Sequence, residues 1–244
     1  MGMPITVDVV GAADPKILDA VFDYFTAIDV RFSTYKSDSE IMRINRGDIK
    51  ESQWSDEMRE ILALAEKTKK ETSGYFDIKT SDGSLDPSGV VKGWAILKAA
   101  ELVRERGYAD FYVDAGGDIQ SSGKNEEGQA WSVGIRNPFN HAEIVKVIYP
   151  RGKGVATSGT AARGQHIYNP HQRGEPLVEI VSITVIGPDV CEADRFATAA
   201  FAMGKEGVAF IERLPGFEAY SIDAKGIATM TSGFNAYTQP HAIH

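Results

Sequence analysis

The first part of the chain alternates apolar and polar residues in a way that predicts a strand followed by a long helix. Residues 5–9 alternate between the two kinds of side chain, which is typical of a half-buried strand. Asp14 and Pro15 predict a helix start, because Asp is a favoured N-cap and Pro is favoured at the first helical position. The apolar residues Ile17, Leu18, Val21, Phe22, Phe25 and Ile28 follow at helical spacing.

Two further helices are expected in the first half. Ser55 is a suitable N-cap for the second helix, and Gly74 follows its end as a stop signal. Its apolar face is Met58, Ile61, Leu62 and Ala65. The third helix is expected to begin near Val90 or Lys92 and to end before Gly107. Its shared apolar face is Ile96, Ala99, Ala100 and Val103.

The second half of the chain is predicted to be mainly strands joined by glycine-rich connections. Apolar runs predict strands at residues 111–114, 131–135, 144–149, 181–186 and 218–222. One helix is expected from about Glu192 to Met203, with Gly204 as its stop, and a hairpin turn at residues 224–226. We therefore predict an α+β fold with mixed, largely antiparallel sheets and packed helices, without the regular alternation of a doubly wound fold.

Net charge, cysteine count and the lengths of apolar runs argue against several classes of protein. The 244-residue chain has a net charge of −8, which argues against a nucleic-acid-binding surface and means that any phosphate site must be built locally. Its one cysteine, Cys191, permits neither an internal disulfide nor a cysteine zinc cluster. No apolar run reaches the roughly 18 residues of a membrane span, and residues 1–4 lack the regions of a signal peptide. The chain as given is expected to be cytoplasmic, with an exported form as the open alternative.

Two segments in the middle of the chain combine glycine with charged groups. Residues 86–93 lie just before a predicted helix, whose free amides favour anions, and Lys92 adds a positive charge. Residues 114–118 follow a predicted strand and contain paired glycines, which permit close backbone approach. An ordinary helix start and an ordinary β-turn explain the same residues, so both interpretations stay open.

Two later segments carry hydroxyl, imidazole and carboxylate groups. Residues 157–160 are small and polar enough to wrap a phosphate, and His166 nearby can move protons near neutral pH. Asp194 and Thr198 are four residues apart on a predicted helix, so they share a face and offer the hard oxygen donors that suit Mg²⁺. The open alternatives are a polar loop and an exposed Asp beside a Thr that bonds its own helix.

Taken together and in order, these segments resemble the ApbE family of FAD:protein FMN transferases. The resemblance runs from Met1 to about Phe234. Its motifs are Met1-Gly2, Phe32-Ser33-Thr34-Tyr35, Asp38-Ser39-Glu40-Ile41 with Asn45, Gly74-Tyr75-Phe76-Asp77-Ile78, Asp86 with Lys92-Gly93, Ala115-Gly116-Gly117-Asp118, Ser158-Gly159-Thr160, His166, Asn169-Pro170, and Ala193-Asp194 with Thr198. Each motif is short, and it is their common order that makes the pattern specific.

The resemblance implies an ApbE-like fold with the active site in a cleft between two lobes. It implies one domain at residues 1–238, in which the two lobes can pack closely, and a C-terminal tail at residues 239–244. The implied activity is Mg²⁺-dependent transfer of FMN from FAD onto a Ser or Thr hydroxyl of an acceptor protein, with release of AMP. FAD is then the substrate, and a protein carrying the acceptor hydroxyl is the partner.

The resemblance also implies roles for particular residues. The metal ligands are Asp194, Thr198 and the backbone carbonyl of Gly89. The catalytic residues are Asp194, Lys92, which steadies the phosphates, and His166, which accepts the hydroxyl proton or stabilises the phosphates. The implied contacts with FAD are Met1, Tyr35, Tyr75, Phe76, Asp77, Asp86, Lys92, Ser158, Gly159, Thr160, His166 and Tyr168.

Two other functions stay open at this stage. An FAD pyrophosphatase would use water as the acceptor and give free FMN and AMP. A flavin-binding protein would hold FAD without reacting with it. The sequence leaves open the acceptor protein, the oligomeric state and the physiological metal.

Overall fold

The computed structural model describes residues 2–11, 14–160, 167–172 and 174–239. The helices in this part are α1 (Pro15–Phe32), α2 (Glu40–Asn45), η1 (Glu51–Gln53), α3 (Asp56–Glu71), α4 (Ser88–Glu105), α5 (Val190–Ala202), α6 (Glu206–Glu212) and η2 (Phe234–Tyr237). The strands are β1 (Ile5–Val9), β2 (Phe111–Ala115), β3 (Asp118–Ser122), β4 (Val133–Asn137), β5 (Asn140–Ile148), β6 (Gly154–Gly159), β7 (Ile180–Gly187), β8 (Glu218–Asp223) and β9 (Ala228–Met230).

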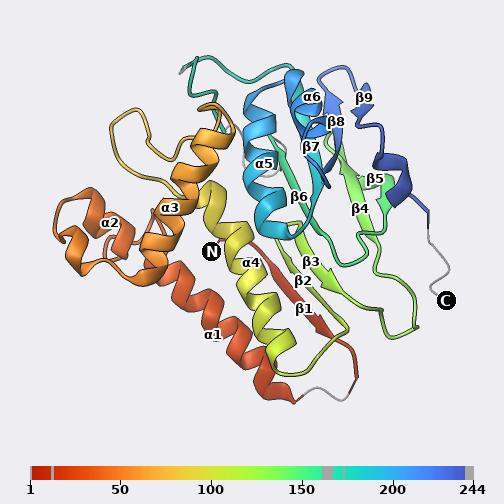
Figure 1. The fold of residues 1–244 in the computed structure, drawn as a ribbon, viewed down its shortest axis with the longest axis horizontal. Helices are drawn as coiled ribbons and strands as arrows, with labels where there is room; N and C mark the ends of the chain where they lie inside the picture. The colour runs from red at the N-terminus through yellow and green to blue at the C-terminus, as the bar shows by residue number, and fades with distance from the viewer. Residues whose placement is uncertain (1, 12–13, 161–166, 173, 240–244) are drawn as a thin grey trace.

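Seven of the strands form one sheet, in the order β1-β2-β3-β6-β7-β8-β9 (Figure 1). Each described pair of neighbours in this sheet runs antiparallel. Strands β4 and β5 pair with each other as a separate antiparallel ribbon, which we call the β4–β5 ribbon. The predicted α+β fold with largely antiparallel sheet is therefore confirmed.

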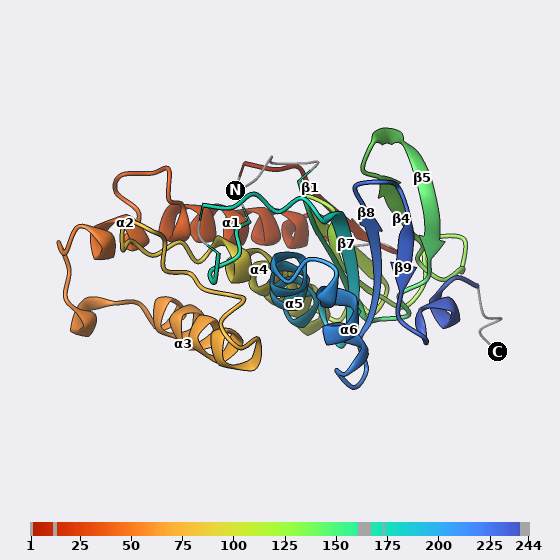
Figure 2. The ribbon, with the colours of Figure 1, turned by 90° about the horizontal axis from the view of Figure 1, so that it is seen from above.

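The sheet lies between two different layers (Figure 2). Successive side chains of a strand point to opposite faces. Ala156 and Val185 therefore pack with the core that contains α5. Val155 and Ile186, each one residue away, pack with residues of the β4–β5 ribbon. Helices thus cover one face of the sheet and the ribbon covers part of the other.

Local signals in the sequence place the starts of α1 and α3 and the end of α4 correctly, whereas α2 and α6 were not predicted. The Asp14 side chain accepts a hydrogen bond from the Lys16 N–H at 3.0 Å, and α1 begins at the next residue after Asp14. Ser55 caps α3 by accepting from the Met58 N–H at 3.1 Å. Gly107 follows α4 at a positive φ of 91°, as expected of a residue that ends a helix. Helix α4 begins at Ser88, slightly before the predicted start.

Strands β3 and β6 are not among the predicted strands: the prediction left residues 119–122 unassigned and treated residues 157–160 as either a polar loop or a phosphate-binding segment. Both strands carry polar residues that lie inside the protein with partners. The Gln120 side chain donates to the Gly152 carbonyl at 2.9 Å and accepts from the Val190 N–H at 2.9 Å. Because these partners come from distant parts of the chain, hydrophobic patterning alone does not reveal the strands.

The helices α4 and α5 carry the residues of the site described below. Helix α4 packs against α1, α3, α5 and the sheet, and residues on several of its sides are buried. Among the described residues, none of the helices combines the length and apolar character needed to cross a membrane.

Candidate active site

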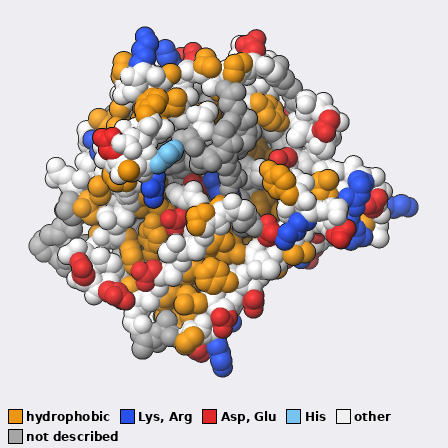
Figure 3. Space-filling view, turned by 180° about the vertical axis from the view of Figure 1, so that it is seen from behind, with side chains coloured by type: hydrophobic (Ala, Val, Ile, Leu, Met, Phe, Trp, Pro, Cys, Tyr) orange, Lys and Arg blue, Asp and Glu red, His pale blue; other side chains and the backbone are white. Residues whose placement is uncertain are grey.

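A cavity of about 720 Å³ lies where the helices, the sheet and the β4–β5 ribbon meet. Its walls come from α4, α5, the turn between β2 and β3, strands β6 and β7, the ribbon, and residues around 75–86 and 167–170. Figure 3 shows hydrophobic side chains gathered around a hollow on the back face of the molecule. A cavity of this volume is in the range of about 300–1,000 Å³ that is typical of small-molecule sites.

Helices α4 and α5 cross closely because glycines remove side chains from their contact. A Cβ atom on Gly93 would lie 2.6 Å from the Cβ atom of Asp194 and 2.7 Å from the carbonyl oxygen of Val190. One turn earlier, a Cβ atom on Gly89 would lie 3.5 Å from Cγ2 of Thr198. Residues four apart on a helix share one face. The two glycines of α4 therefore lie against Asp194 and Thr198 of α5.

Asp194 is a buried carboxylate that is held by helix α4. Its Oδ2 accepts a hydrogen bond from the Gly93 N–H at 2.8 Å, and its Oδ1 lies 3.5 Å from Nζ of Lys92. Burial raises the pKa of Asp194 to about 7; the Lys92 ammonium opposes this rise and the Asp118 carboxylate adds to it. A buried carboxylate with a raised pKa in a cavity is typical of a functional site.

A second buried carboxylate, Asp118, lies beside the same lysine. Its Oδ2 is 2.6 Å from Nζ of Lys92, and its Oδ1 accepts a hydrogen bond from the Thr157 N–H at 3.0 Å. Asp118 is the first residue of β3, directly after the paired glycines Gly116 and Gly117. Lys92 is therefore held between carboxylates of β3 and α5.

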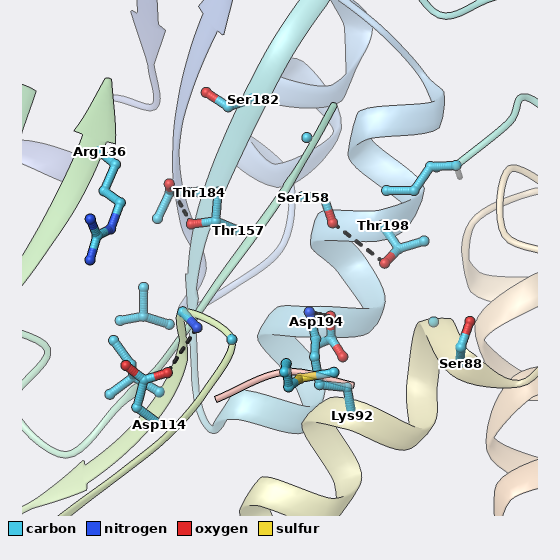
Figure 4. Close-up of a pocket in the computed structure, with 18 of the residues that line it drawn as sticks. Ser88, Lys92, Asp114, Arg136, Thr157, Ser158, Ser182, Thr184, Asp194 and Thr198 are labelled. Atoms are coloured by element: carbon cyan, nitrogen blue, oxygen red, sulfur yellow. Dashed lines mark hydrogen bonds and ion pairs between the residues drawn. The ribbon is translucent and has the colours of Figure 1, made fainter. Parts of the chain in front are cut away.

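Hydroxyl groups continue the polar part of the cavity along β6 and β7. Oγ of Ser158 lies 3.5 Å from Oγ1 of Thr198, and Figure 4 shows the two side chains facing each other. Oγ1 of Thr157 lies 2.8 Å from Oγ1 of Thr184 on the neighbouring strand, and by alternation these two side chains share the ribbon-covered face with Val155 and Ile186. The end of the cavity at α5 thus gathers oxygen donors from α5 and β6, and a further hydroxyl pair lies toward the ribbon.

A second wall consists of two segments that bind each other. The Tyr168 hydroxyl donates to the carbonyls of Asp77 and Lys79, at 3.2 and 3.1 Å. The rings of Tyr75 and His171 meet edge to face with 4.6 Å between their centroids. These contacts hold residues 167–172 against residues 75–79, and both segments contribute to the cavity.

The opposite end of the cavity is largely apolar. Its hydrophobic lining residues are Ile119, Val133, Ile135, Ile144 and Val155. Asp114 and Arg136 add one acidic and one basic group at this end (Figure 4). Burial raises the pKa of the Asp114 carboxyl above its usual value, and the positive charge of Arg136 opposes the rise. The cavity therefore has a polar end at the α4–α5 crossing and a mostly apolar end beneath the ribbon.

The structure brings most of the sequence-predicted site residues into this cavity. Those in its lining are Tyr75, Phe76, Asp77, Asp86, Gly89, Lys92, Ser158, Gly159, Tyr168, Asp194 and Thr198. Tyr35 is not in the lining, and its side chain is 98% exposed. Thr160 is also outside the lining, and its N–H donates to the Val181 carbonyl at 3.1 Å. Met1 and His166 lie outside the described residues, so their roles stay predictions.

Several lining residues were not predicted as site residues from the sequence. Arg136 and His141 belong to the β4–β5 ribbon, and nothing in a strand pattern shows which cavity a ribbon will cover. Thr157 and Thr184 become neighbours only when β6 and β7 pair. The sequence carries one signal for Asp118, because it directly follows the paired glycines of residues 116–117.

The donor set at the α4–α5 crossing is compatible with a magnesium ion. Within the part of the chain that the structure describes, no group of three or more His, Cys, Asp or Glu side chains forms a metal cluster. Magnesium instead suits one or two carboxylates with other oxygen donors, and leaves positions for water and substrate phosphates. In a regular helix the Gly93 N–H would bond the Gly89 carbonyl. Because this N–H donates to Asp194, the Gly89 carbonyl shares or loses its helical donor.

Comparison with known protein families identifies the family of this chain. The sequence profile of the ApbE family matches residues 1–82 and 79–221. This chain belongs to the ApbE family. The matched regions of this ApbE-family chain include Gly89, Lys92, Asp118, Asp194 and Thr198.

Curated relatives carry a common name but are longer than the region they share with this ApbE-family chain. A Klebsiella pneumoniae protein named FAD:protein FMN transferase is 32% identical over 166 residues, covering 64% of this chain and 46% of that protein. An Escherichia coli protein of the same name is 32% identical over 162 residues, covering 62% of this chain and 46% of that protein. The chain thus spans about half the length of the relatives it matches.

Solved structures confirm the ApbE-like fold over nearly the whole chain. The flavin transferase ApbE from Vibrio cholerae matches with a TM-score of 0.84 and 21% identity, covering 97% of this chain and 96% of that one. The ApbE protein from Thermotoga maritima matches with a TM-score of 0.84 and 20% identity, with the same coverage. At this identity the likeness concerns the fold.

Proposed function

We propose that this chain is a Mg²⁺-dependent transferase that moves FMN from FAD onto a Ser or Thr hydroxyl of an acceptor protein and releases AMP. The observation that carries the proposal is the α4–α5 crossing, where a buried carboxylate, a hydroxyl and glycine backbone meet in the wall of a cavity. The name FAD:protein FMN transferase, which belongs to relatives about 30% identical to this chain, supports the same activity.

The two ends of the cavity suit the two kinds of group in FAD. A pyrophosphate needs cations, amides or a metal, and the α4–α5 crossing has Lys92, the first turn of α4 and the oxygen donors that we assign to Mg²⁺. A flat ring system needs apolar surface with a few polar contacts, and the end beneath the β4–β5 ribbon offers this. We therefore assign the pyrophosphate to the crossing and a ring of FAD to the apolar end.

Asp194, Thr198 and the Gly89 carbonyl are the residues that we assign to the magnesium ion. Bound there, the ion would neutralise negative charge on the phosphates and orient them for in-line attack. Lys92 adds an ammonium beside Asp194, at 3.5 Å from its Oδ1. The first turn of α4 adds the partial positive charge of a helix N-terminus, since Ser88 and Gly89 both line the cavity.

The proposed transfer exchanges the phosphoanhydride bond of FAD for a phosphate ester bond to the acceptor. The acceptor oxygen forms a bond with the FMN phosphorus, and the bond from that phosphorus to the bridging oxygen breaks. AMP leaves with the bridging oxygen, and the acceptor hydroxyl gives its proton to a base. The sequence predicts His166 as this base, a residue outside the described part of the chain.

Mass spectrometry tests the proposal directly. The chain is incubated with FAD and MgCl₂, with and without candidate acceptor proteins, and both proteins and nucleotides are weighed. We expect an acceptor to gain the mass of FMN less one water, and AMP to appear in equal amount. Asp194→Ala is the inactive comparison, and Asp48→Asn is the matched control, since Asp48 is an exposed carboxylate paired with Arg46 away from the cavity.

The same experiment separates the other two functions. Free FMN and AMP without acceptor modification would mean that water is the acceptor, as in a pyrophosphatase. FAD that stays intact and bound through a long incubation with Mg²⁺ would mean a flavin-binding protein. Transfer that is unchanged in Asp194→Ala would remove Asp194 from the metal site.

A further inference from the structure

Asp118 has no assigned role in the proposed reaction, yet it is the closest carboxylate to Lys92 among the described ion pairs. Its Oδ2 lies 2.6 Å from Nζ of Lys92, whereas Oδ1 of Asp194 lies 3.5 Å from the same atom. Asp118 is fully buried, and apart from this ammonium its Oδ2 has no partner among the described residues. The lysine is therefore drawn toward β3 and away from α5.

The position of Asp118 is fixed from two sides. Its Oδ1 accepts the Thr157 N–H of β6 at 3.0 Å, and its backbone belongs to β3, which pairs with both β2 and β6. The neighbouring residue on β6, Ser158, faces Thr198 across 3.5 Å. One carboxylate thus links the sheet, the lysine of α4 and the strand opposite the proposed metal ligands.

We propose that Asp118 is a positioning residue that holds Lys92 away from Asp194 and so keeps the Asp194 carboxylate available to a divalent cation. The inference rests on the proposed function, because it takes Asp194 as a metal ligand. An ammonium paired closely with Asp194 would compete with Mg²⁺ for the same oxygen atoms. Asp118 lowers that competition by binding the ammonium more closely itself.

Asp118→Asn tests the positioning role of Asp118, because an amide of the same size cannot attract the Lys92 ammonium as a carboxylate does. Asp194 is the other carboxylate within 4 Å of Lys92 in the described ion pairs, so we expect the lysine to move toward it. The measurement is a titration of the whole, metal-free chain with Mn²⁺ at about pH 8, following free Mn²⁺ by electron paramagnetic resonance. We expect the affinity to fall about 10- to 100-fold, as for other residues that orient metal ligands.

A double variant separates positioning from simple damage to the fold. In Asp118→Asn/Lys92→Met the competing ammonium is gone, so Mn²⁺ affinity is expected to return to within about threefold of the wild-type value. If the double variant binds no better than Asp118→Asn alone, the role of Asp118 is structural and the inference is wrong.

Asp114→Asn controls for the loss of one negative charge near the site. Asp114 lies on the same hairpin and also lines the cavity, but its Oδ1 accepts the Gly117 N–H at 2.8 Å and no ion pair with Lys92 is described for it. We expect this variant to change Mn²⁺ affinity by less than about threefold. An effect as large as that of Asp118→Asn would attribute the result to net charge and overturn the inference.

Failure of the inference can be told from failure of the proposed function. If Asp194→Asn loses Mn²⁺ binding while Asp118→Asn keeps it, Asp118 has no positioning role and the metal assignment stands. If the wild-type chain and Asp194→Asn bind Mn²⁺ equally or not at all, the metal assignment fails and the inference fails with it.

Discussion

The two ends of the cavity are built in opposite ways. The α4–α5 crossing is buried and polar, and its charged groups are fixed by helix packing and by Gly89 and Gly93. The end beneath the β4–β5 ribbon is mostly apolar and more exposed, since Ile144 lines the cavity while 46% of its surface is accessible. The ribbon pairs with no strand of the main sheet in the described structure.

This difference indicates that the two ends of the cavity serve different functions, the chemical step and the binding of a ring. Fixed charges in a site that excludes water interact more strongly than charges in solution. The crossing is therefore suited to the chemical step. An exposed apolar wall provides contact area but no fixed charge. The ribbon is therefore suited to binding a ring, and substitutions in it should affect the reaction rate little. The following variants test whether rate and binding separate in this way.

The largest effect is expected at the crossing itself. Asp194→Asn removes the carboxylate charge but keeps a side chain of similar size beside Gly93. Because the metal assignment depends on that charge, FMN transfer should fall by at least about 100-fold. Initial rates of AMP release at saturating FAD measure this, and circular dichroism checks the fold. Loss of only a few-fold in rate would mean that the crossing and the ribbon do not differ as described.

Gly93→Ala tests the closeness of the two helices. The new Cβ would lie 2.6 Å from the Cβ of Asp194, so α4 and α5 must move apart. We expect a loss of about 1–3 kcal/mol in the free energy of unfolding, measured by urea denaturation. Gly89→Ala is the matched comparison and should cost less, because its Cβ meets the outer edge of the Phe76 ring at 2.9 Å. Equal losses in the free energy of unfolding for the two variants would mean that the closest approach of α4 and α5 is not at Gly93.

The pH dependence of metal binding tests whether the Asp194 carboxylate at the crossing must lose a proton before Mg²⁺ binds. Burial raises the pKa of Asp194 from 3.8 to about 7 in the metal-free protein. Between these values the folded state keeps a proton that the unfolded state has released, so this group lowers the free energy of unfolding as pH rises. Mg²⁺ must displace that proton, so the increase in melting temperature with MgCl₂ should be larger at about pH 8 than at about pH 6. An equal increase in melting temperature at both pH values would contradict the assignment of Asp194 as a metal ligand.

A smaller effect is expected at the ribbon. Ile144→Ala removes apolar contact from the wall but no charge. A loss of about 1 kcal/mol of binding corresponds to a rise of about fivefold in KM for FAD, with kcat nearly unchanged. Steady-state kinetics separate the two constants. A fall in kcat comparable with that of Asp194→Asn would mean that the ribbon takes part in the chemical step.

The smallest effect is expected at Tyr35, where sequence and structure point in different directions. The family resemblance implies a contact with FAD, but the side chain is 98% exposed and outside the cavity lining. From its position we expect Tyr35→Ala to change KM for FAD by less than about twofold. A tenfold increase in KM would instead support the contact that the sequence implies.

Much of the helical framework was predictable from local signals. Asp14 and Ser55 cap the helices that their sequences predict, because an N-cap depends only on neighbouring residues. Strands β3 and β6 were not predicted, because their buried polar groups find partners far along the chain. The side chain of Gln120, for example, bonds Gly152 and Val190.

The candidate site shows the same limit. The spacing of Asp194 and Thr198 places them on one helical face, but it does not show which helix they meet. Only the fold brings Gly89 and Gly93 to them, and only the pairing of β3 with β6 places Asp118 beside Lys92. Contacts across the chain are set by tertiary packing, which spacing in the sequence does not contain.

The metal assignment can be tested directly in a crystal of the chain soaked with Mn²⁺ and FAD, with the ion located by its anomalous scattering. We expect an anomalous peak within coordination distance of the Asp194 carboxylate, the Thr198 hydroxyl and the Gly89 carbonyl, with the FAD pyrophosphate beside it. A peak bound by other residues, or FAD held at the crossing without any ion, would show that these three groups do not form the metal site.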